Sequence, residues 1–200
     1  MTITCMKKRA FLIHGWEGYP EEGWFPWLSE ELSKKGFKVE VLPMPNSQSP
    51  KIEEWVPFLA KNVGEIDEKT VLIGHSIGCQ TIWRYLESLK EGERIAGAVL
   101  VAPWIRLKAE NALQDEESKE IAKPWLEIPI AWEKVKKNCG KFVVILSDDD
   151  PYVYLEDGKF FKEQLGAKLI IEHNMKHFSG DDGINILPSA KEAVLSLASD

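Results

Sequence analysis

The chain has 200 residues, a formal net charge of −7, 44% hydrophobic residues and 28% charged residues. This length suits one α/β domain over residues 1–200, which can bury roughly 70% of the unfolded surface. The acidic balance argues against nucleic acid and anionic membrane as partners, because both require a basic face. The apolar run from Ala10 to Ile13 is too short for a secretory signal, and no run approaches the ~20 residues of a membrane span, so we expect a cytoplasmic protein.

Short apolar runs alternate with longer amphipathic segments, a pattern typical of βα units on a parallel sheet. The three central runs are almost purely apolar, as expected of strands that are covered on both faces. The sequence predicts six strands: Arg9 to His14, Phe37 to Leu42, Thr70 to His75, Ile95 to Val101, Lys141 to Ser147 and Lys168 to Glu172.

Helical periodicity between these runs predicts the covering helices. They are Trp24 to Lys35, Ile52 to Val63, Ile77 to Leu89, a short helix around Val135, Asp157 to Leu165 and Leu187 to Ala198. The stretch 105–127 breaks the rhythm because it is charged and weakly periodic. It forms either a small excursion over the sheet or a solvated helix and loop.

A possible nucleophile lies in the segment Gly74-His75-Ser76-Ile77-Gly78, which matches G-x-S-x-G. The segment follows an apolar strand and opens a helix, which is the context that a nucleophile elbow requires. The two glycines leave room for the neighbouring backbone, and the helix N-terminus directs free N–H groups at the reaction centre. We therefore predict that Ser76 is a catalytic nucleophile, with His75 packed away from it.

An elbow of this kind needs an oxyanion hole, with one N–H from the residue after the nucleophile and one from the loop after the first strand. His14-Gly15-Trp16 occupies that loop. We predict that the hole is formed by the backbone N–H groups of Trp16 and Ile77, with His14 orienting the loop. A simple glycine turn that leaves the strand is the alternative for this segment.

The general base should be a histidine after the last strand, and both His173 and His177 qualify. His173 abuts the strand, whereas His177 lies farther along the loop and has more freedom to reach Ser76. The sequence favours His177 and leaves His173 as the alternative.

The acid should follow the fifth strand, where three consecutive aspartates, Asp148, Asp149 and Asp150, precede Pro151. The chain order Ser, Asp, His is that of α/β-hydrolases. We predict that Asp150 is the acid, because it lies three residues beyond the strand and Pro151 fixes the following turn. Asp148 and Asp149 are then solvated or capping residues.

Several segments together resemble the retinoblastoma-binding protein nine type of small serine hydrolases. The resemblance covers nearly the whole chain and includes, besides the segments above, Pro20 to Leu28, Pro43 to Asn46, Ile52 to Trp55, Ala102 to Trp104, Asp149 to Val153 and His177-Phe178. It implies an α/β-hydrolase core without a large cap, a triad of Ser76, Asp150 and His177, and activity on small esters or amides.

Two positions depart from the family pattern. Lys176 stands where the family usually has glycine before the catalytic histidine, which could alter the loop and the pKa of His177. The Leu-x-Cys-x-Glu motif of retinoblastoma binding is absent around Cys5, Cys79 and Cys139, so no such partner is carried over. The three cysteines also form neither a disulfide framework nor a zinc-ligand pattern.

The sequence therefore predicts an α/β-hydrolase fold with strand order 2-1-3-4-5-6 and a carboxylesterase-like serine hydrolase that needs neither metal nor organic cofactor. Its partner would be a small-molecule ester or amide substrate, and Trp104 and Trp16 could line the pocket for it. A peptidase or thioesterase with the same triad is the enzymatic alternative. A binding protein with a hydrolase fold and little turnover is the non-enzymatic one.

Overall fold

The computed structural model describes residues 7–198, which form one six-stranded sheet in the order β2-β1-β3-β4-β5-β6 with every neighbouring pair parallel. Both the sheet and the predicted strand order are confirmed. The strands are β1 (Arg9–Ile13), β2 (Lys38–Leu42), β3 (Thr70–His75), β4 (Ile95–Val101), β5 (Cys139–Ser147) and β6 (Lys168–Glu172).

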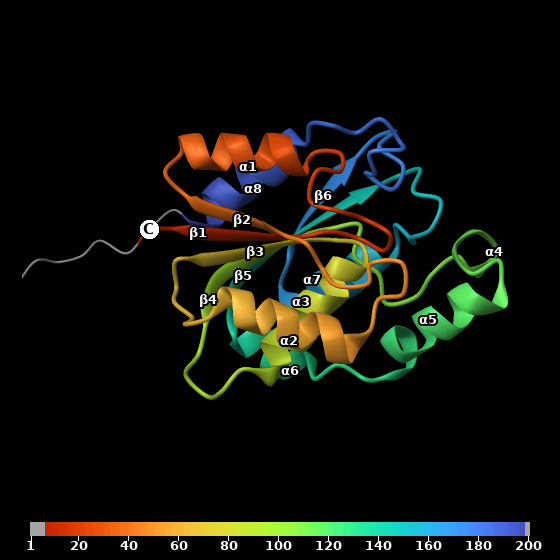
Figure 1. The fold of residues 1–200 in the computed structure, drawn as a ribbon, viewed down its shortest axis with the longest axis horizontal. Helices are drawn as coiled ribbons and strands as arrows, with labels where there is room; N and C mark the ends of the chain where they lie inside the picture. The colour runs from red at the N-terminus through yellow and green to blue at the C-terminus, as the bar shows by residue number, and fades with distance from the viewer. Residues whose placement is uncertain (1–6, 199–200) are drawn as a thin grey trace, which may run out of the picture.

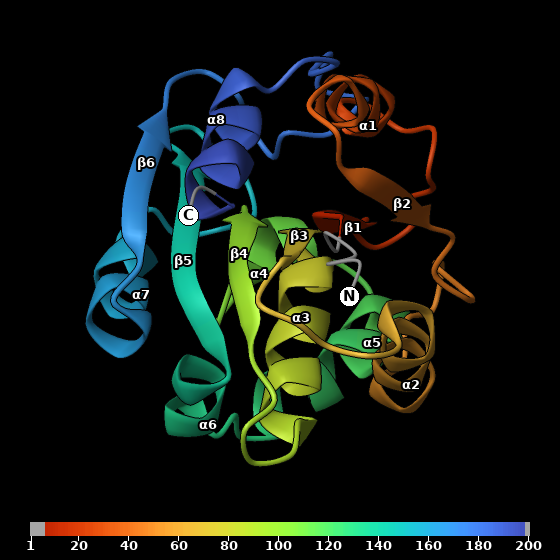
Figure 2. The same ribbon diagram turned by 90° about the vertical axis from the view of Figure 1, so that its left-hand side faces the viewer.

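Helices cover both faces of the sheet, as Figures 1 and 2 show. One face carries α1 (Phe25–Lys34) and α8 (Pro188–Leu197). The other carries α2 (Ile52–Val63), α3 (Ile77–Ser88), α6 (Trp132–Lys137) and α7 (Asp157–Leu165). Because both faces are covered, β3 is buried over its whole length, which explains the apolar run from Val71 to Ile73 within it.

The prediction for the start of the fifth strand was wrong by two residues, because β5 begins at Cys139 rather than Lys141. Gly140, which looked like a helix-ending residue, lies inside the strand. A Cβ at this position would collide with the backbone oxygen of Ala96, and glycine allows the two strands to lie this close. The first strand also ends one residue early, at Ile13, and the second starts one residue late, at Lys38.

The stretch 105–127 contains two helices, α4 (Ala109–Ala112) and α5 (Glu116–Glu127), which lie beyond the carboxyl ends of the strands, with α5 next to α2 (Figure 1). α5 begins with a capping box in which the Asp115 side chain accepts from the backbone N–H of Ser118. Its charged surface is interrupted by the buried Trp125, whose ring packs against Trp55 at a centroid distance of 6.2 Å. Ala122 is the other buried residue of α5, so only two of its twelve residues are buried, which explains why the helical periodicity is weak.

Tryptophans account for much of the interior. Five of the eight in the chain are almost completely buried: Trp24, Trp55, Trp83, Trp104 and Trp125. The buried apolar side chains form one cluster that includes residues from every strand except β6. Within residues 7–198, no helix is both long enough and apolar enough to cross a membrane.

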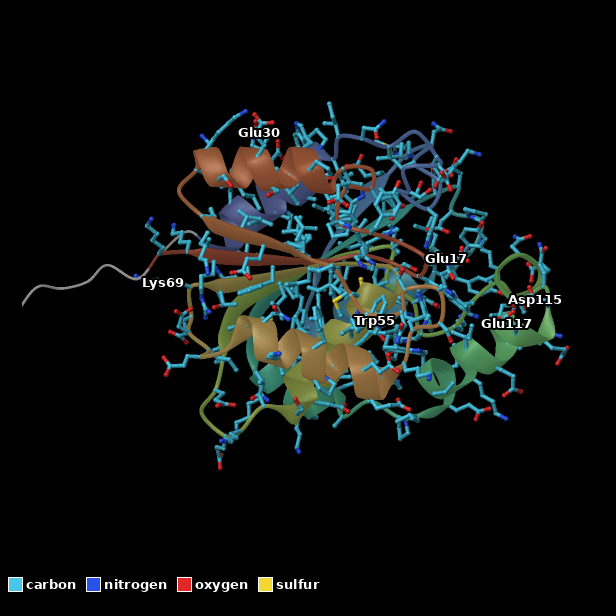
Figure 3. All side chains as sticks on the ribbon, in the orientation of Figure 1. Glu17, Glu30, Trp55, Lys69, Asp115 and Glu117 are labelled. Atoms are coloured by element: carbon cyan, nitrogen blue, oxygen red, sulfur yellow. The ribbon has the colours of Figure 1, made fainter. Side chains whose placement is uncertain are left out.

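Figure 3 shows the two ends of the sheet through single side chains. Lys69 precedes β3 and lies at the amino end of the strands, whereas Glu17 follows β1 and lies at the carboxyl end. The loops that follow the strands therefore meet at the end marked by Glu17, which is where parallel α/β folds place their ligand sites.

Candidate active site

Ser76 occupies the sharp turn between β3 and α3, with φ 52° and ψ −119°. A non-glycine residue in this conformation is strained, and such strain persists only where the surrounding structure holds it. The backbone N–H of Ser76 donates to the carbonyl of Val101 at 2.9 Å, and the Ser76 carbonyl accepts from the N–H of Cys79 at 3.0 Å. Ser76 thus has the backbone geometry of a nucleophile elbow.

The glycines of this segment are required by close backbone approach. A Cβ on Gly78 would lie 2.5 Å from the carbonyl oxygen of Ile13, and one on Gly74 would lie 2.8 Å from the backbone nitrogen of Cys79. Without these side chains, the start of α3 can lie directly against the end of β1. This contact brings the elbow beside the loop in which the oxyanion hole is predicted.

Gly15 and Trp16 belong to that loop, which adjoins the nucleophile. A Cβ on Gly15 would lie 3.5 Å from the Cβ of Ser76. The Trp16 indole N–H donates to the carbonyl of Gln48 at 2.9 Å, and the N–H of Glu17 donates to the carbonyl of Ser47 at 2.7 Å. The loop is therefore held by the segment after β2, and the oxyanion role of the Trp16 and Ile77 N–H groups stays a prediction.

His14 is a buried structural residue that connects the same two loops. Its Nε2 accepts the backbone N–H of Met44 at 3.0 Å, so Nδ1 carries the proton and donates to the carbonyl of Gly15 at 2.9 Å. Burial lowers the pKa of His14, which keeps the imidazole neutral in this arrangement.

Asp150 lies in the turn after β5 with its side chain only 1% exposed. Its Oδ1 accepts the backbone N–H groups of Tyr152 at 2.8 Å and Val153 at 3.0 Å, and its Oδ2 lies 2.9 Å from Nδ1 of His177. These contacts fix the carboxylate plane and leave one oxygen for the imidazole. The structure therefore brings together the two residues that the sequence proposed as acid and base.

The alternative residues form a separate pair. His173 Nδ1 lies 2.5 Å from Asp148 Oδ2, and the His173 side chain is 75% exposed. Asp149 accepts the Ser147 hydroxyl at 2.6 Å and the backbone N–H of Lys176 at 2.8 Å, so it connects the two turns. Among the described residues no hydrogen bond joins His177 to Ser76, although such contacts are often long before substrate binds.

The backbone around His177 explains why glycine suits the preceding position. Lys176 has φ 47° and Phe178 has φ 59°, and both values lie in the left-handed region that glycine adopts without strain. The chain adopts this conformation with a lysine at position 176.

Three side chains that the sequence analysis did not single out also contact this region. Asp182 accepts the backbone N–H of His177 at 3.1 Å, and the ring of Tyr152 stands edge-on to the His177 ring at a centroid distance of 5.0 Å. Lys108 Nζ donates to the Asp150 carbonyl at 2.7 Å, which attaches the 105–127 stretch to the acid turn. Tyr152 belongs to the segment Asp149 to Val153 that carries the family resemblance, whereas Asp182 and Lys108 belong to none of the motifs described above.

Trp104 is only 2% exposed and belongs to the hydrophobic core, while its carbonyl accepts the Gln80 side-chain N–H at 2.9 Å. A hollow of about 340 Å³ lies farther away, between the start of α2 and α5, and its lining includes Pro50, Ile121 and Trp125 but neither Ser76 nor Trp104. The role of Trp104 in a substrate pocket stays a prediction.

Within residues 7–198, no group of three or more histidine, cysteine, aspartate or glutamate side chains could hold a metal ion. Cys79 and Cys139 are buried free thiols, and burial raises the pKa of both. Cys5 lies outside the described residues.

Two proteins resemble the chain over most of its length. The first, from Bacillus subtilis (strain 168), bears the name "Putative hydrolase YdeN" and is 29% identical over 191 residues, covering 96% of each chain. The second, the serine hydrolase RBBP9 of Rattus norvegicus, is 29% identical over 161 residues, covering 80% of each chain.

Solved structures show the same fold. The crystal structure of the YdeN product of B. subtilis superposes with a TM-score of 0.85 at 28% identity, covering 96% of this chain and all of that one. The Pyrococcus furiosus esterase Pf2001 superposes with a TM-score of 0.63 at 19% identity, covering 95% and 80%. The fold is therefore that of the α/β-hydrolases, as the sequence predicted.

The decisive similarity is to a family rather than to one relative. The family model for serine hydrolases matches residues 10–196, from the first strand to the last helix, and includes every residue of the candidate site. The chain belongs to the serine hydrolase family.

Proposed function

We propose that the chain hydrolyses small carboxylic esters or amides through a triad of Ser76, His177 and Asp150. The observation that carries this proposal is the 2.9 Å contact between Asp150 Oδ2 and His177 Nδ1, made by side chains that are 1% and 13% exposed. A buried, oriented imidazole beside a strained serine turn is the arrangement that nucleophilic serine catalysis needs.

The contact assigns a role to each group. Because Asp150 holds the Nδ1–H of neutral His177, the ring nitrogen Nε2 keeps its lone pair for the Ser76 hydroxyl. Ser76 Oγ bonds to the substrate carbonyl carbon while its proton passes to Nε2, and the same proton then leaves with the alcohol or amine. Water repeats the sequence on the acyl-enzyme and releases the carboxylic acid and free Ser76.

Two further groups would stabilise the charged intermediates. The Trp16 and Ile77 N–H groups would hold the oxyanion, and each such donor is worth about 3 kcal/mol in related enzymes. Asp150 would stabilise the imidazolium through Oδ2, because its Oδ1 is already held by the N–H groups of Tyr152 and Val153. These steps use only groups of the protein, substrate and water.

An esterase-like activity is the finer part of the proposal. It is supported by the fold that the chain shares with the Pf2001 esterase, and by the absence of any further chemical requirement for ester cleavage. The same triad could act on thioesters or aminoacyl amides, so the comparison of substrates belongs in the test.

The test is Ser76→Ala. This variant should fold like the wild type and lose activity by roughly 10⁶-fold, the size of effect seen when a triad serine is removed elsewhere. Ser196→Ala, which changes an exposed serine on α8, is the control and should keep full activity. Hydrolysis would be measured on p-nitrophenyl acetate and on matched thioester and aminoacyl-amide probes, together with labelling by a fluorophosphonate.

A Ser76→Ala variant that kept a tenth of the activity would end the proposal. Wild-type protein that is not labelled by the fluorophosphonate and turns over none of the probes would instead indicate a binding protein with a hydrolase fold.

A further inference from the structure

His75, the residue before the proposed nucleophile, lies against both the His177 loop and the loop that carries Gly15. It ends β3, is 4% exposed, and its Nε2 lies 2.7 Å from the backbone carbonyl of His177. A carbonyl oxygen only accepts, so Nε2 carries the proton and donates it to this contact. The sequence predicted only that the His75 ring would be packed, and it did not predict this hydrogen bond to the backbone of His177.

The ring of His75 is enclosed by neighbours that fix its orientation. Its centroid lies 5.0 Å from that of His177, and Trp24 and Phe25 stand edge-on to it at 6.2 and 6.4 Å. A Cβ on Gly15 would lie 3.0 Å from its Nδ1, so the oxyanion loop packs against the other ring nitrogen. The His75 ring thus lies between the elbow at Ser76, the loop that carries Gly15 and Trp16, and the loop that carries His177.

The ring is uncharged at ordinary pH. Burial lowers the pKa of His75 to about 3, and the neighbouring His177 ring acts in the same direction. A neutral ring with its proton on Nε2 can hold the His177 carbonyl without placing a second positive charge beside the imidazolium that forms in catalysis.

The His177 loop needs such a contact because its backbone is strained on both sides of His177, at Lys176 and Phe178. Asp182 holds the N–H of His177 at 3.1 Å, and the Trp24 indole N–H holds the carbonyl of Phe178 at 3.0 Å. The contact from His75 differs from these two, because it comes from the residue adjacent to Ser76 in the chain.

We propose that His75 is a positioning residue, whose Nε2–H to the His177 carbonyl sets the distance and angle between the His177 imidazole and Ser76. This inference rests on the proposed triad. If the contact is lost, the His177 loop can shift relative to the elbow while substrate binding at the surface stays the same. A displacement near 1 Å between reacting groups can cost about 10²-fold in rate, so the effect should fall on kcat rather than on KM.

The experiment compares substitutions at His75 that differ in reach. In His75→Gln the side-chain amide nitrogen extends about as far as Nε2 and can donate to the same carbonyl, whereas in His75→Asn it is too short. His75→Leu fills the space between Trp24 and His177 without adding an unpaired polar atom, so it serves if His75→Asn does not fold. The probe is p-nitrophenyl acetate, assayed below the melting temperature of every variant.

We expect His75→Asn and His75→Leu to lose about 10²-fold in kcat with KM within twofold of wild type, and fluorophosphonate labelling of Ser76 to slow in parallel. His75→Gln should keep at least a third of the wild-type kcat. Val194→Ala, which truncates a fully buried side chain on α8, should lower the melting temperature without changing kcat. This control separates positioning from a general loss of stability.

Either of two results would overturn the inference. One is a His75→Leu variant with kcat within threefold of wild type. The other is a His75→Gln variant as impaired as His75→Leu, which would mean that ring shape and not the donated hydrogen bond matters. Ser76→Ala is measured in the same assay to distinguish these results from a failure of the triad. If Ser76→Ala is active, the proposed triad itself is wrong. If it is inactive, either result overturns only the positioning role of His75.

Discussion

The turns after β5 and β6 carry two Asp–His pairs of the same chemistry in opposite environments. In the outer pair, the His173 and Asp148 side chains are 75% and 37% exposed. In the inner pair, the His177 and Asp150 side chains are 13% and 1% exposed, and Asp150 accepts two backbone N–H groups besides the imidazole. The two pairs therefore have similar Asp–His distances and differ in how far their side chains are exposed.

The difference lies in what surrounds each pair. The hydrogen bond to Asp148 raises the pKa of His173, and the same bond lowers the pKa of Asp148, as expected for a surface ion pair. Such pairs contribute little because solvent screens them. The His177 ring of the inner pair contacts Tyr152, and the His177 carbonyl is connected through His75 to β3, which ends at the residue before Ser76.

The largest expected effect comes from replacing each of the two histidines, His177 and His173, with alanine in separate variants. His177→Ala should lower kcat by about 10⁶-fold, since removal of the base from a serine triad costs nearly as much as removal of the nucleophile. His173→Ala is the matched control and should stay within about twofold of wild type, because the exposed ring contacts only Asp148. Steady-state hydrolysis of p-nitrophenyl acetate measures both, and the reverse pattern would make His173 the base.

Replacing the aspartates should also affect kcat unequally, and the largest effect should be smaller than that of His177→Ala. Asp150→Asn should lower kcat by roughly 10⁴-fold, because an amide that donates to Nδ1 would leave His177 in the wrong tautomer. Asp148→Asn and Asp149→Asn should change kcat little, since in the second variant the side-chain amide oxygen can still accept the backbone N–H of Lys176. If Asp149→Asn proved to be the crippling change, the assignment of the acid would be wrong by one residue.

The buried histidines and the exposed His173 should affect the pH dependence of the free energy of unfolding in opposite directions. Because the pKa of His75 is lowered to about 3, the unfolded chain binds more protons than the folded one between pH 6.5 and 3. The contribution of this ring to the free energy of unfolding is therefore fully present above pH 6.5. It falls below that pH by at most about 1.4 kcal/mol per pH unit. His14 adds a loss of the same sign, since burial also lowers its pKa.

Urea unfolding at pH 7, 6 and 5 would measure this slope. His75→Gln should unfold with a shallower loss of stability on acidification than the wild type, because the titrating ring is gone. The raised pKa of His173 has the opposite effect on the free energy of unfolding. Its contribution is fully present below the pKa of the unfolded chain and is lost as the pH rises through the pKa of the folded chain. His173→Gln should therefore leave the acid slope unchanged or slightly steeper; a shallower slope would contradict this account.

The smallest effect concerns the backbone that precedes the inner histidine. Lys176→Gly should stabilise the protein by roughly 0.5–1 kcal/mol, because glycine relieves the strain of a positive φ and the gain is partly offset by unfolded-chain entropy. Asn174→Gly, at φ 57°, is the control and should gain less, since asparagine tolerates this region better than lysine. Thermal unfolding of both variants measures the difference, and a destabilised Lys176→Gly would mean that the lysine side chain itself holds the loop.

Local patterns predicted much of the fold and the candidate nucleophile. Apolar runs separated by amphipathic segments indicate buried strands between covering helices, and this pattern predicted the parallel sheet. The strand order followed from the α/β-hydrolase core that the motif and the family resemblance imply. G-x-S-x-G predicted the elbow because its residues meet the requirements of that turn: a positive φ at Ser76 and room for close backbone contacts at Gly74 and Gly78. The turn at Ser76 and the approach of Gly74 to Cys79 are local features that the motif itself displays, whereas the approach of Gly78 to Ile13 arises only in the folded chain.

Tertiary structure alone decided how distant side chains pair. Three adjacent aspartates and two histidines are nearly equivalent along the chain, and the partners Asp150 and His177 lie 27 residues apart. Only the packing of the two turns makes one pair buried and leaves the other in solvent. The same holds for the hydrogen bond from His75 to His177 and for the anchor of α5 at Trp125, because burial is a property of the assembled molecule and not of any segment in it.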